Sequence, residues 1–141
     1  MIQDRPFQIG IFVQDLEAAM TQVGSALGLT WSDIRDRELD DGGHLRVVFS
    51  HQGPPHIELI EGPPGSAWDA SAGPRIDHLG YWSDDFAADR DRLERDGVPE
   101  IRGDHRRTHH QTAHGFRIEL FDDRTRDGFY EQWRIGHRAP D

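Results

Sequence analysis

Residues 7–16 read FQIGIFVQDL, and residues 77–86 read DHLGYWSDDF. Both stretches place a polar side chain two positions before a glycine, then an apolar or aromatic run, then an aspartate followed by a large apolar residue. Later in each half, HIELIEG at 56–62 is echoed by RIELFDD at 117–123. Self-similarity of this kind indicates that the chain contains two copies of one structural module.

Each copy carries one polar residue near its start and one glutamate near its end. These are Gln8 and Glu58 in the first copy, and His78 and Glu119 in the second. Their sequence neighbours are mostly apolar, and successive side chains of a strand point to opposite faces. All four side chains should therefore lie away from the helices, on the concave face of a curved sheet. One imidazole and three oxygen ligands suit Zn, Ni, Co or Mn, so the repeat predicts one divalent metal ion bound by both copies.

The first copy has the pattern of a strand, a helix and then further strands. Apolar residues at alternate positions from Phe7 to Val13 predict a strand with Gln8 on the face opposite to Phe7. Asp15 is a good N-cap for a helix that carries apolar residues every three or four positions and ends at Gly28. Further strands are expected near 31–38, at 45–51 and at 56–61.

The second copy repeats this plan. A strand at 76–82 precedes a helix that is capped by Asp84 or Asp85 and stops at Gly97, and strands follow near 100–103, 106–112 and 116–121. We therefore expect an α+β fold in which two βαβββ modules form a curved, half-open mixed sheet. The single domain, 1–141, would comprise module 1 (6–62), a linker rich in Gly and Pro (62–75), module 2 (76–123) and a C-terminal tail (124–141) with a short aromatic helix.

Composition limits the partners and the chemistry. A net charge of -10 argues against nucleic acid and against anionic membrane surfaces. The chain has no long apolar run, so we expect no signal peptide, no membrane span and a cytoplasmic location. It contains neither Cys nor Lys, since all 16 basic residues are Arg, which excludes a thiolate nucleophile, a Schiff-base lysine and a P-loop. Carboxylates, histidines, hydroxyls or a metal ion must carry any chemistry.

The chain resembles the vicinal oxygen chelate superfamily over residues 6–123. The resemblance is carried by the openings FQIGIFVQDLEAAM and IDHLGYWSDDFAAD and by the closings HIELIEG and FRIELFDD. This superfamily contains glyoxalase I, methylmalonyl-CoA epimerase, extradiol dioxygenases and bleomycin-resistance proteins. The resemblance implies metal ligands on the first and last strands of each module, and these positions hold Gln8, Glu58, His78 and Glu119. It also implies a homodimer.

The ligand set looks like that of a glyoxalase or an epimerase, because a dioxygenase needs two His and one carboxylate. By this resemblance, Glu119 is the first choice for a catalytic base and Glu58 the second. We therefore expect a metal-dependent lyase or isomerase that transfers a proton at a carbon next to a carbonyl of a small molecule. The alternative is a non-catalytic protein of the bleomycin-resistance kind, which would hold an aromatic drug or natural product between Trp and Phe side chains.

Further residues are expected to contact the substrate. These are Phe12, Trp82, Phe121, His109 and Arg107. His109 and His110 are neighbours on an expected strand and point to opposite faces, so they are not expected to bind one ion together. The expected cavity walls also include the loops 39–44, 62–75 and 103–114, in which no pattern names the substrate.

Overall fold

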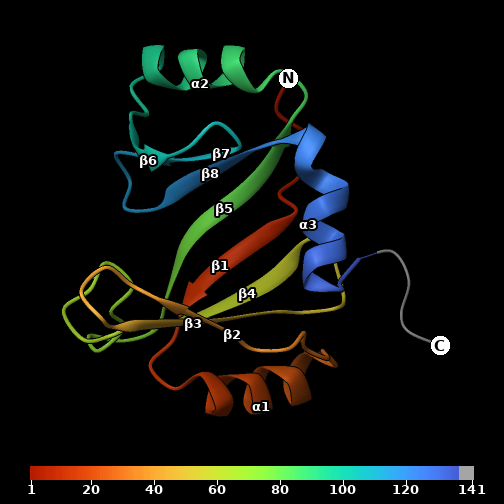
Figure 1. Cartoon of the computed structure of the whole chain (residues 1–141), viewed down its shortest axis with the longest axis vertical. Coiled ribbons are helices and arrows are strands. Elements are labelled where there is room, and N and C mark those ends of the chain that lie inside the picture. Colours follow the sequence, from red (N-terminus) through yellow and green to blue (C-terminus); the bar gives the residue numbers. More distant parts are fainter. Residues whose placement is uncertain (137–141) are drawn as a thin grey trace.

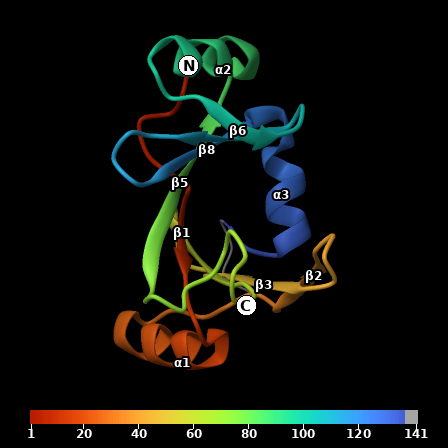
Figure 2. The same cartoon turned by 90° about the vertical axis from the view of Figure 1, so that its left-hand side faces the viewer.

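In the computed structural model, which describes residues 1–136, the strands form one eight-stranded sheet in the order β2-β3-β4-β1-β5-β8-β7-β6. The strands are β1 (Gln8–Phe12), β2 (Arg35–Glu38), β3 (His44–Phe49), β4 (His56–Glu61), β5 (Arg75–Ser83), β6 (Glu100–Gly103), β7 (Arg107–Gln111) and β8 (Arg117–Asp122). The helices are α1 (Leu16–Leu27), α2 (Phe86–Arg95), a short 3-10 turn (Asp123–Thr125) and α3 (Arg126–Trp133). The sheet curls so that its ends face each other, with α1 and α2 outside it and α3 on the open side (Figure 1 and Figure 2).

Each half of the sheet is one copy of the module. β1 pairs with β4, and β5 pairs with β8, both in parallel, whereas the other pairs are antiparallel. The halves meet where β1 and β5 pair, with His78 opposite Gly10. The expected α+β fold, with two βαβββ modules in a curved mixed sheet, is confirmed. One chain therefore brings both copies of the repeat side by side.

The outer helices begin and end near the residues that the sequence predicts. The side chain of Asp15 caps α1 by accepting a hydrogen bond from the backbone N–H of Ala18. The helix ends at Gly28, whose φ of 68° lies in the left-handed region that favours glycine. Asp85 caps α2 in the same way, through the backbone N–H of Ala88.

The outer helices cover the apolar side of the sheet. Leu59 is buried in the cluster beneath α1, and Leu120 is buried in the cluster beneath α2. Each leucine follows one of the repeated glutamates in the sequence, so Glu58 and Glu119 point to the opposite, concave face. Burial of the leucines beneath the helices therefore directs the two glutamates to the other face of the sheet.

The strand expected from Phe7 begins one residue later, at Gln8. Phe7 does not share the outer face with Ile11 of β1, which packs in the cluster beneath α1. Its ring stacks on Trp82 at a centroid distance of 4.1 Å and meets Phe121 and Phe129 edge-on. The expectation that Phe7 lies opposite to Gln8 is wrong, because burial of these rings under α3 outweighs strand alternation.

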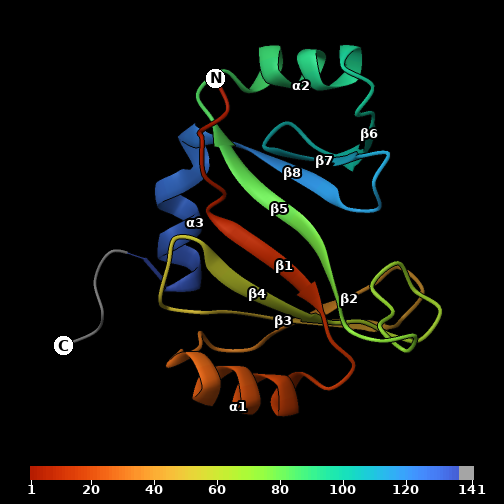
Figure 3. The same ribbon diagram turned by 180° about the vertical axis from the view of Figure 1, so that it is seen from behind.

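The expected C-terminal helix is present as α3, which packs against the concave side. Its Phe129 and Trp133 meet Phe49 edge-on, at centroid distances of 5.4 and 4.6 Å. Figure 3 shows the central strands β4, β1, β5 and β8 from behind, with α3 beyond them. Residues 137–141 of the expected tail lie outside the described part of the chain. No helix within residues 1–136 is both long enough and apolar enough to span a membrane.

Candidate metal centre

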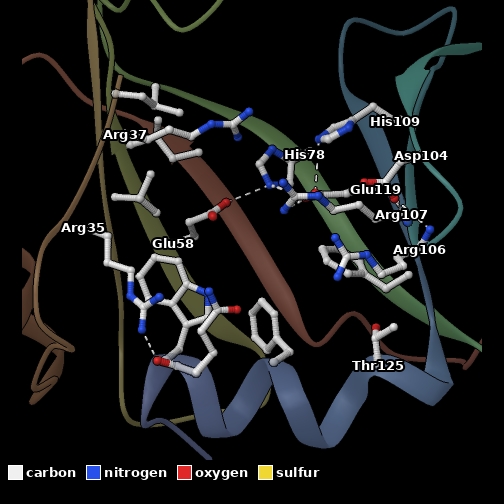
Figure 4. Close-up of a pocket in the computed structure, with 18 of the residues that line it drawn as sticks. Arg35, Arg37, Glu58, His78, Asp104, Arg106, Arg107, His109, Glu119 and Thr125 are labelled. Atoms are coloured by element: carbon white, nitrogen blue, oxygen red, sulfur yellow. Dashed lines mark hydrogen bonds and ion pairs between the residues drawn. The ribbon is translucent and has the colours of Figure 1, made fainter. Parts of the chain in front are cut away.

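The four polar residues of the repeat come together on the concave face. The Nε2 atom of His78 lies 2.9 Å from Oε1 of Glu58 and 3.1 Å from Oε2 of Glu119. Gln8 donates a hydrogen bond of 2.7 Å from its Nε2 to Oε2 of Glu119. Figure 4 shows Glu58, His78 and Glu119 converging from three different strands. One donor atom each from these three residues lies within 4.8 Å of the others, which is compact enough to surround one ion.

The glycines of the repeat make this convergence possible. A Cβ on Gly10 would come within 2.1 Å of the imidazole of His78. A Cβ on Gly80 would come within 2.3 Å of the side chain of Gln8. The glycine of each copy therefore leaves room for the polar side chain of the other copy, since no larger residue fits there without a shift of the ring or the amide.

A second carboxylate orients His78. The Nδ1 atom of His78 donates to Oδ2 of Asp77 over 3.0 Å, and Arg117 in turn lies 3.2 Å from Oδ1 of Asp77. Burial acts to lower the pKa of His78, but hydrogen bonds to Asp77 and Glu119 hold that pKa well above its usual value. With Nδ1 occupied by Asp77, Nε2 faces the other donors and is the nitrogen that could bind a metal.

Glu119 is a buried carboxylate held in its charged form. Burial acts to raise its pKa, but the charge of His109 and hydrogen bonds to His109 and His78 hold that pKa well below its usual value. The contacts divide between its two oxygens. Oε2 contacts Gln8 and His78, whereas Oε1 lies 3.2 Å from Nε2 of His109 and 3.9 Å from Nη1 of Arg107.

The donor set fits a divalent metal ion. The Oε1 atom of Gln8 is buried without a hydrogen-bond partner among the described residues. A half-turn of the amide exchanges Oε1 and Nε2 and directs the oxygen toward His78 and Glu119. Two carboxylates balance the charge of a divalent ion, and a neutral imidazole with an amide oxygen completes a set typical of Zn, Ni, Co or Mn. Gln8, Glu58, His78 and Glu119 are thus the residues that would hold it.

A cavity of about 910 Å³ opens beside the donors, between the two modules and α3. Glu58, His78 and Glu119 lie in its wall. Of the residues expected to contact a substrate, Phe121, His109 and Arg107 also line it. Figure 4 shows His109 and Arg107 reaching into the cavity from the side of β7, close to Glu119. The space is large enough for a small organic molecule in contact with the donors.

The structure places the other two residues elsewhere. Phe12 is fully buried in a cluster with Leu45 and Ile60, and it does not line the cavity. Trp82 is buried against Phe7 and does not line it either. Both rings instead support the concave face from within, because they pack beneath residues that do reach the cavity, such as Ile60 and Phe121.

The two neighbouring histidines diverge as strand alternation predicts. His109 faces Glu119 and the cavity. His110 is completely buried, 3.2 Å from the backbone oxygen of Val98 and 2.8 Å from the hydroxyl of Thr108. Burial lowers the pKa of His110, although its hydrogen bond to Val98 acts in the opposite direction. The pair cannot bind one ion together.

Sequence reasoning missed several residues around the site. Strand alternation predicts Asp77 on the face opposite to His78, but the register of β1 and β5 shifts at this point, and the carboxylate of Asp77 lies 3.0 Å from Nδ1 of His78. The cavity is also lined by arginines that the sequence alone did not place, namely Arg35, Arg37, Arg102 and Arg124, and by Arg106 of the expected loop 103–114. The sequence carries no signal for Arg102, because it lies opposite His109 only through a shift of register between Glu100 and Arg102.

Among solved structures, the chain is similar to methylmalonyl-CoA epimerase from Mycobacterium tuberculosis, with 24% identity, a TM-score of 0.63, and 86% of this chain and 92% of that chain covered. It is similar to a mutant of 4-hydroxymandelate synthase from Streptomyces coelicolor, with 14% identity and a TM-score of 0.69. That match covers 84% of this chain and 47% of the synthase chain. A protein from Bacillus halodurans C-125 is similar at 18% identity and a TM-score of 0.67, with 97% and 98% covered. At these identities the likeness shows the fold alone.

Among curated proteins, no sequence matches this chain. The family model of the glyoxalase/bleomycin resistance protein/dioxygenase superfamily matches residues 7–118. That match spans both copies of the repeat, including Gln8, Glu58 and His78, and ends one residue before Glu119. On this match and on its fold, the chain belongs to the glyoxalase/bleomycin resistance protein/dioxygenase superfamily.

Proposed function

We propose that the protein is a metal-dependent lyase or isomerase that transfers a proton at a carbon next to a carbonyl of a small molecule. One observation carries the proposal, namely the convergence of Gln8, Glu58, His78 and Glu119 on one point beside a cavity. A divalent ion bound there supplies a Lewis acid for negative charge that forms on an oxygen next to the reacting carbon. Without Cys or Lys, the chain has no thiolate or amine with which to stabilise such charge covalently.

Glu119 is the proposed base. Its Oε2 belongs to the donor cluster, and its Oε1 points away from the cluster toward His109 and Arg107 in the cavity. These neighbours keep the carboxylate unprotonated, and Glu119 lines the cavity, so it is placed to act as a base on a substrate carbon. Glu58 is the second choice, because it also lines the cavity and its only described partner is His78.

Asp77 and Arg117 orient His78 without contacting the substrate. They hold the ring of His78 through Nδ1 and fix which nitrogen faces the donors. α3 contributes differently, because its Phe129 and Trp133 line the cavity and exclude water from one side. The substrate would therefore lie between the donor cluster and an aromatic wall.

The alternative is a protein that binds an aromatic ligand without changing it. A specific observation favours this reading, since aromatic side chains from three parts of the chain line the cavity: Trp68, Phe121, Phe129 and Trp133. Rings of this kind could stack on a flat ligand. The two proposed functions can be distinguished by experiment, because only the enzyme needs the donor cluster to be intact.

Proton exchange with solvent tests the proposal. Candidate 2-oxo acids, hemithioacetals and acyl-CoA thioesters are incubated with the metal-loaded protein in D₂O and followed by NMR. We expect deuterium to enter at the carbon next to the carbonyl, and to do so only when metal is present. The binding protein is favoured instead if no compound exchanges while an aromatic ligand binds the metal-free protein tightly and unchanged.

We also propose that the protein is a homodimer. The outer strands β2 and β6 each leave one edge without a partner in the described sheet, and free edges tend to pair. Light scattering at micromolar concentration should give about twice the mass of the 16.1 kDa chain. A species of single-chain mass alone would contradict the dimer. The cytoplasmic location stays a prediction from the sequence.

A further inference from the structure

The cavity gathers positive charge in an acidic protein. The chain has a net charge of -10, yet six of its 16 basic residues line this one cavity. Four carboxylates line it as well, but Glu58 and Glu119 belong to the donor cluster. Of the other two, Asp36 pairs with His44, and Asp104 accepts hydrogen bonds from the backbone of its own turn. The cavity is therefore left with more guanidinium groups than anions to balance them.

The arginines of the cavity are not equivalent. Arg124 is paired with Asp122, and Arg35 lies over the ring of Trp133 and donates to a backbone oxygen of α3. Arg102 is different. Its guanidinium stacks on Trp68, 5.0 Å from the ring centroid, and it forms no ion pair with any residue of the described range 1–136. Burial, and after it the charge of Arg117, lowers the pKa of Arg102, as expected for a cation held without a counter-ion.

Arg102 lies in line with the donor cluster. Across the sheet, Arg102 of β6 is opposite His109 of β7, and His109 is opposite Glu119 of β8. Strands in a sheet are about 4.8 Å apart, so the backbone of Arg102 is about 10 Å from that of Glu119. Arg107, two residues before His109 on β7, places Nη1 3.9 Å from Oε1 of Glu119. A molecule that touches the donor cluster and extends toward β6 would meet both guanidinium groups.

The repeat departs from its symmetry at these positions. In module 2, Arg107 is opposite Phe121 and His109 is opposite Glu119. In module 1, the corresponding partners of Ile60 and Glu58 are Val47 and Phe49. Two apolar residues of β3 thus correspond to two basic residues of β7. Beside the donors, the module 2 side of the cavity therefore presents basic side chains where the module 1 side presents the apolar Val47, which suits a molecule with an anionic group on the module 2 side.

We propose that the substrate carries an anionic group, a carboxylate or a phosphate, beyond its reacting carbonyl, and that Arg102 and Arg107 bind this group. The inference rests on the proposed function, because that function places the carbonyl of the substrate at the donor cluster. Arg is suited to the task, because its planar guanidinium donates two parallel hydrogen bonds to a carboxylate or phosphate. Bound in this way, the anion would also supply the counter-ion that Arg102 lacks.

A matched pair of probes tests the proposal by calorimetry. The compounds 2-oxoglutarate and 2-oxopentanoate share the 2-oxo acid group and the chain length, but only the first carries a distal carboxylate. We expect the metal-loaded protein to bind 2-oxoglutarate about 10-fold or more tightly than 2-oxopentanoate, the scale of a hydrogen bond between charged groups. Arg102→Gln and Arg107→Gln should each reduce this preference. Arg95→Gln, an exposed position on α2, is the control and should keep the preference.

Metal-free protein separates this inference from the proposed function. Glutarate and inorganic phosphate, titrated without metal, should bind wild type more tightly than Arg102→Gln, and the stronger of the two identifies the anion. Equal affinity for the two 2-oxo acids would overturn the inference even if proton exchange is observed. So would the absence of binding by every probe at millimolar concentration. A preference for 2-oxoglutarate without any proton exchange would support the anion site and count against the proposed reaction.

Discussion

The imidazole of His78 lies directly against Gly10 of the adjacent strand, where a Cβ would approach the ring to 2.1 Å. Gly10→Ala should therefore push the ring away from Glu58 and Glu119. We expect the variant to lose metal affinity and to lower the free energy of unfolding by about 1–3 kcal/mol, the usual cost of overpacking. Urea denaturation measures the second effect. Gly128→Ala in α3, where a Cβ would meet nothing within 4 Å, is the control and should not lower the stability, because alanine favours a helix more than glycine does.

Elemental analysis of protein purified without a histidine tag should give one divalent metal ion per chain. His78→Ala removes the only nitrogen donor of the cluster, so the variant should contain no stoichiometric metal. His105→Ala, which changes an exposed histidine, should retain it. A His78→Ala protein with as much metal as the wild type would refute the site.

Asp77→Asn tests the support of His78. The amide cannot accept the Nδ1 proton as strongly as a carboxylate, and it no longer balances Arg117. We expect metal affinity to fall by about 10–100-fold, the range typical of the partners of metal ligands. A competition titration with a chelator measures this, with Asp91→Asn on exposed α2 as the control. Unchanged affinity in Asp77→Asn would show that the contact is only structural.

Glu119→Gln should slow proton exchange at the substrate carbon by on the order of 10²-fold or more, the usual contribution of a positioned base. Glu58→Gln should slow it less if Glu119 is the base. The rates are compared at saturating metal, so that a lost ligand is not mistaken for a lost base. If Glu58→Gln has the larger effect under these conditions, the assignment of the two glutamates is reversed.

His110 should make the fold sensitive to acid. Burial lowers its pKa in the folded protein, so the unfolded chain binds a proton more readily as the pH falls through the ordinary histidine value of about 6.5. The contribution of neutral His110 to stability is therefore present above that pH and declines below it. Between about pH 7 and about pH 5, metal-free wild type should lose more unfolding free energy than His110→Gln. Parallel losses in both proteins would exclude this role.

The fold and the central donors could be predicted because both depend on local periodicity. Alternation within β4 and β8 is enough to turn Glu58 and Glu119 away from the leucines that follow them. The repeat then places Gln8 and His78 at equivalent points, and the pairing of β1 with β5 brings them together.

The remaining features depend on long-range packing. Phe7 leaves its expected face because Trp82 and α3 offer it aromatic contacts, and α3 lies more than a hundred residues away in the sequence. Arg102 lies opposite His109 only because the register of β6 and β7 shifts between Glu100 and Arg102. A strand of four residues is too short for its sequence pattern to predict such a shift.

β1 and β5 form the one strand pair of the described sheet that joins the two modules. The donors lie on both sides of this seam, with Gln8 and Glu58 from one module and His78 and Glu119 from the other. An ion that binds all of them would link the two modules, so its binding free energy would stabilise the contact between them. Thermal melting of the loaded protein should then occur in one cooperative step at a temperature that rises with free metal concentration, whereas chelation would allow the halves to separate along the seam.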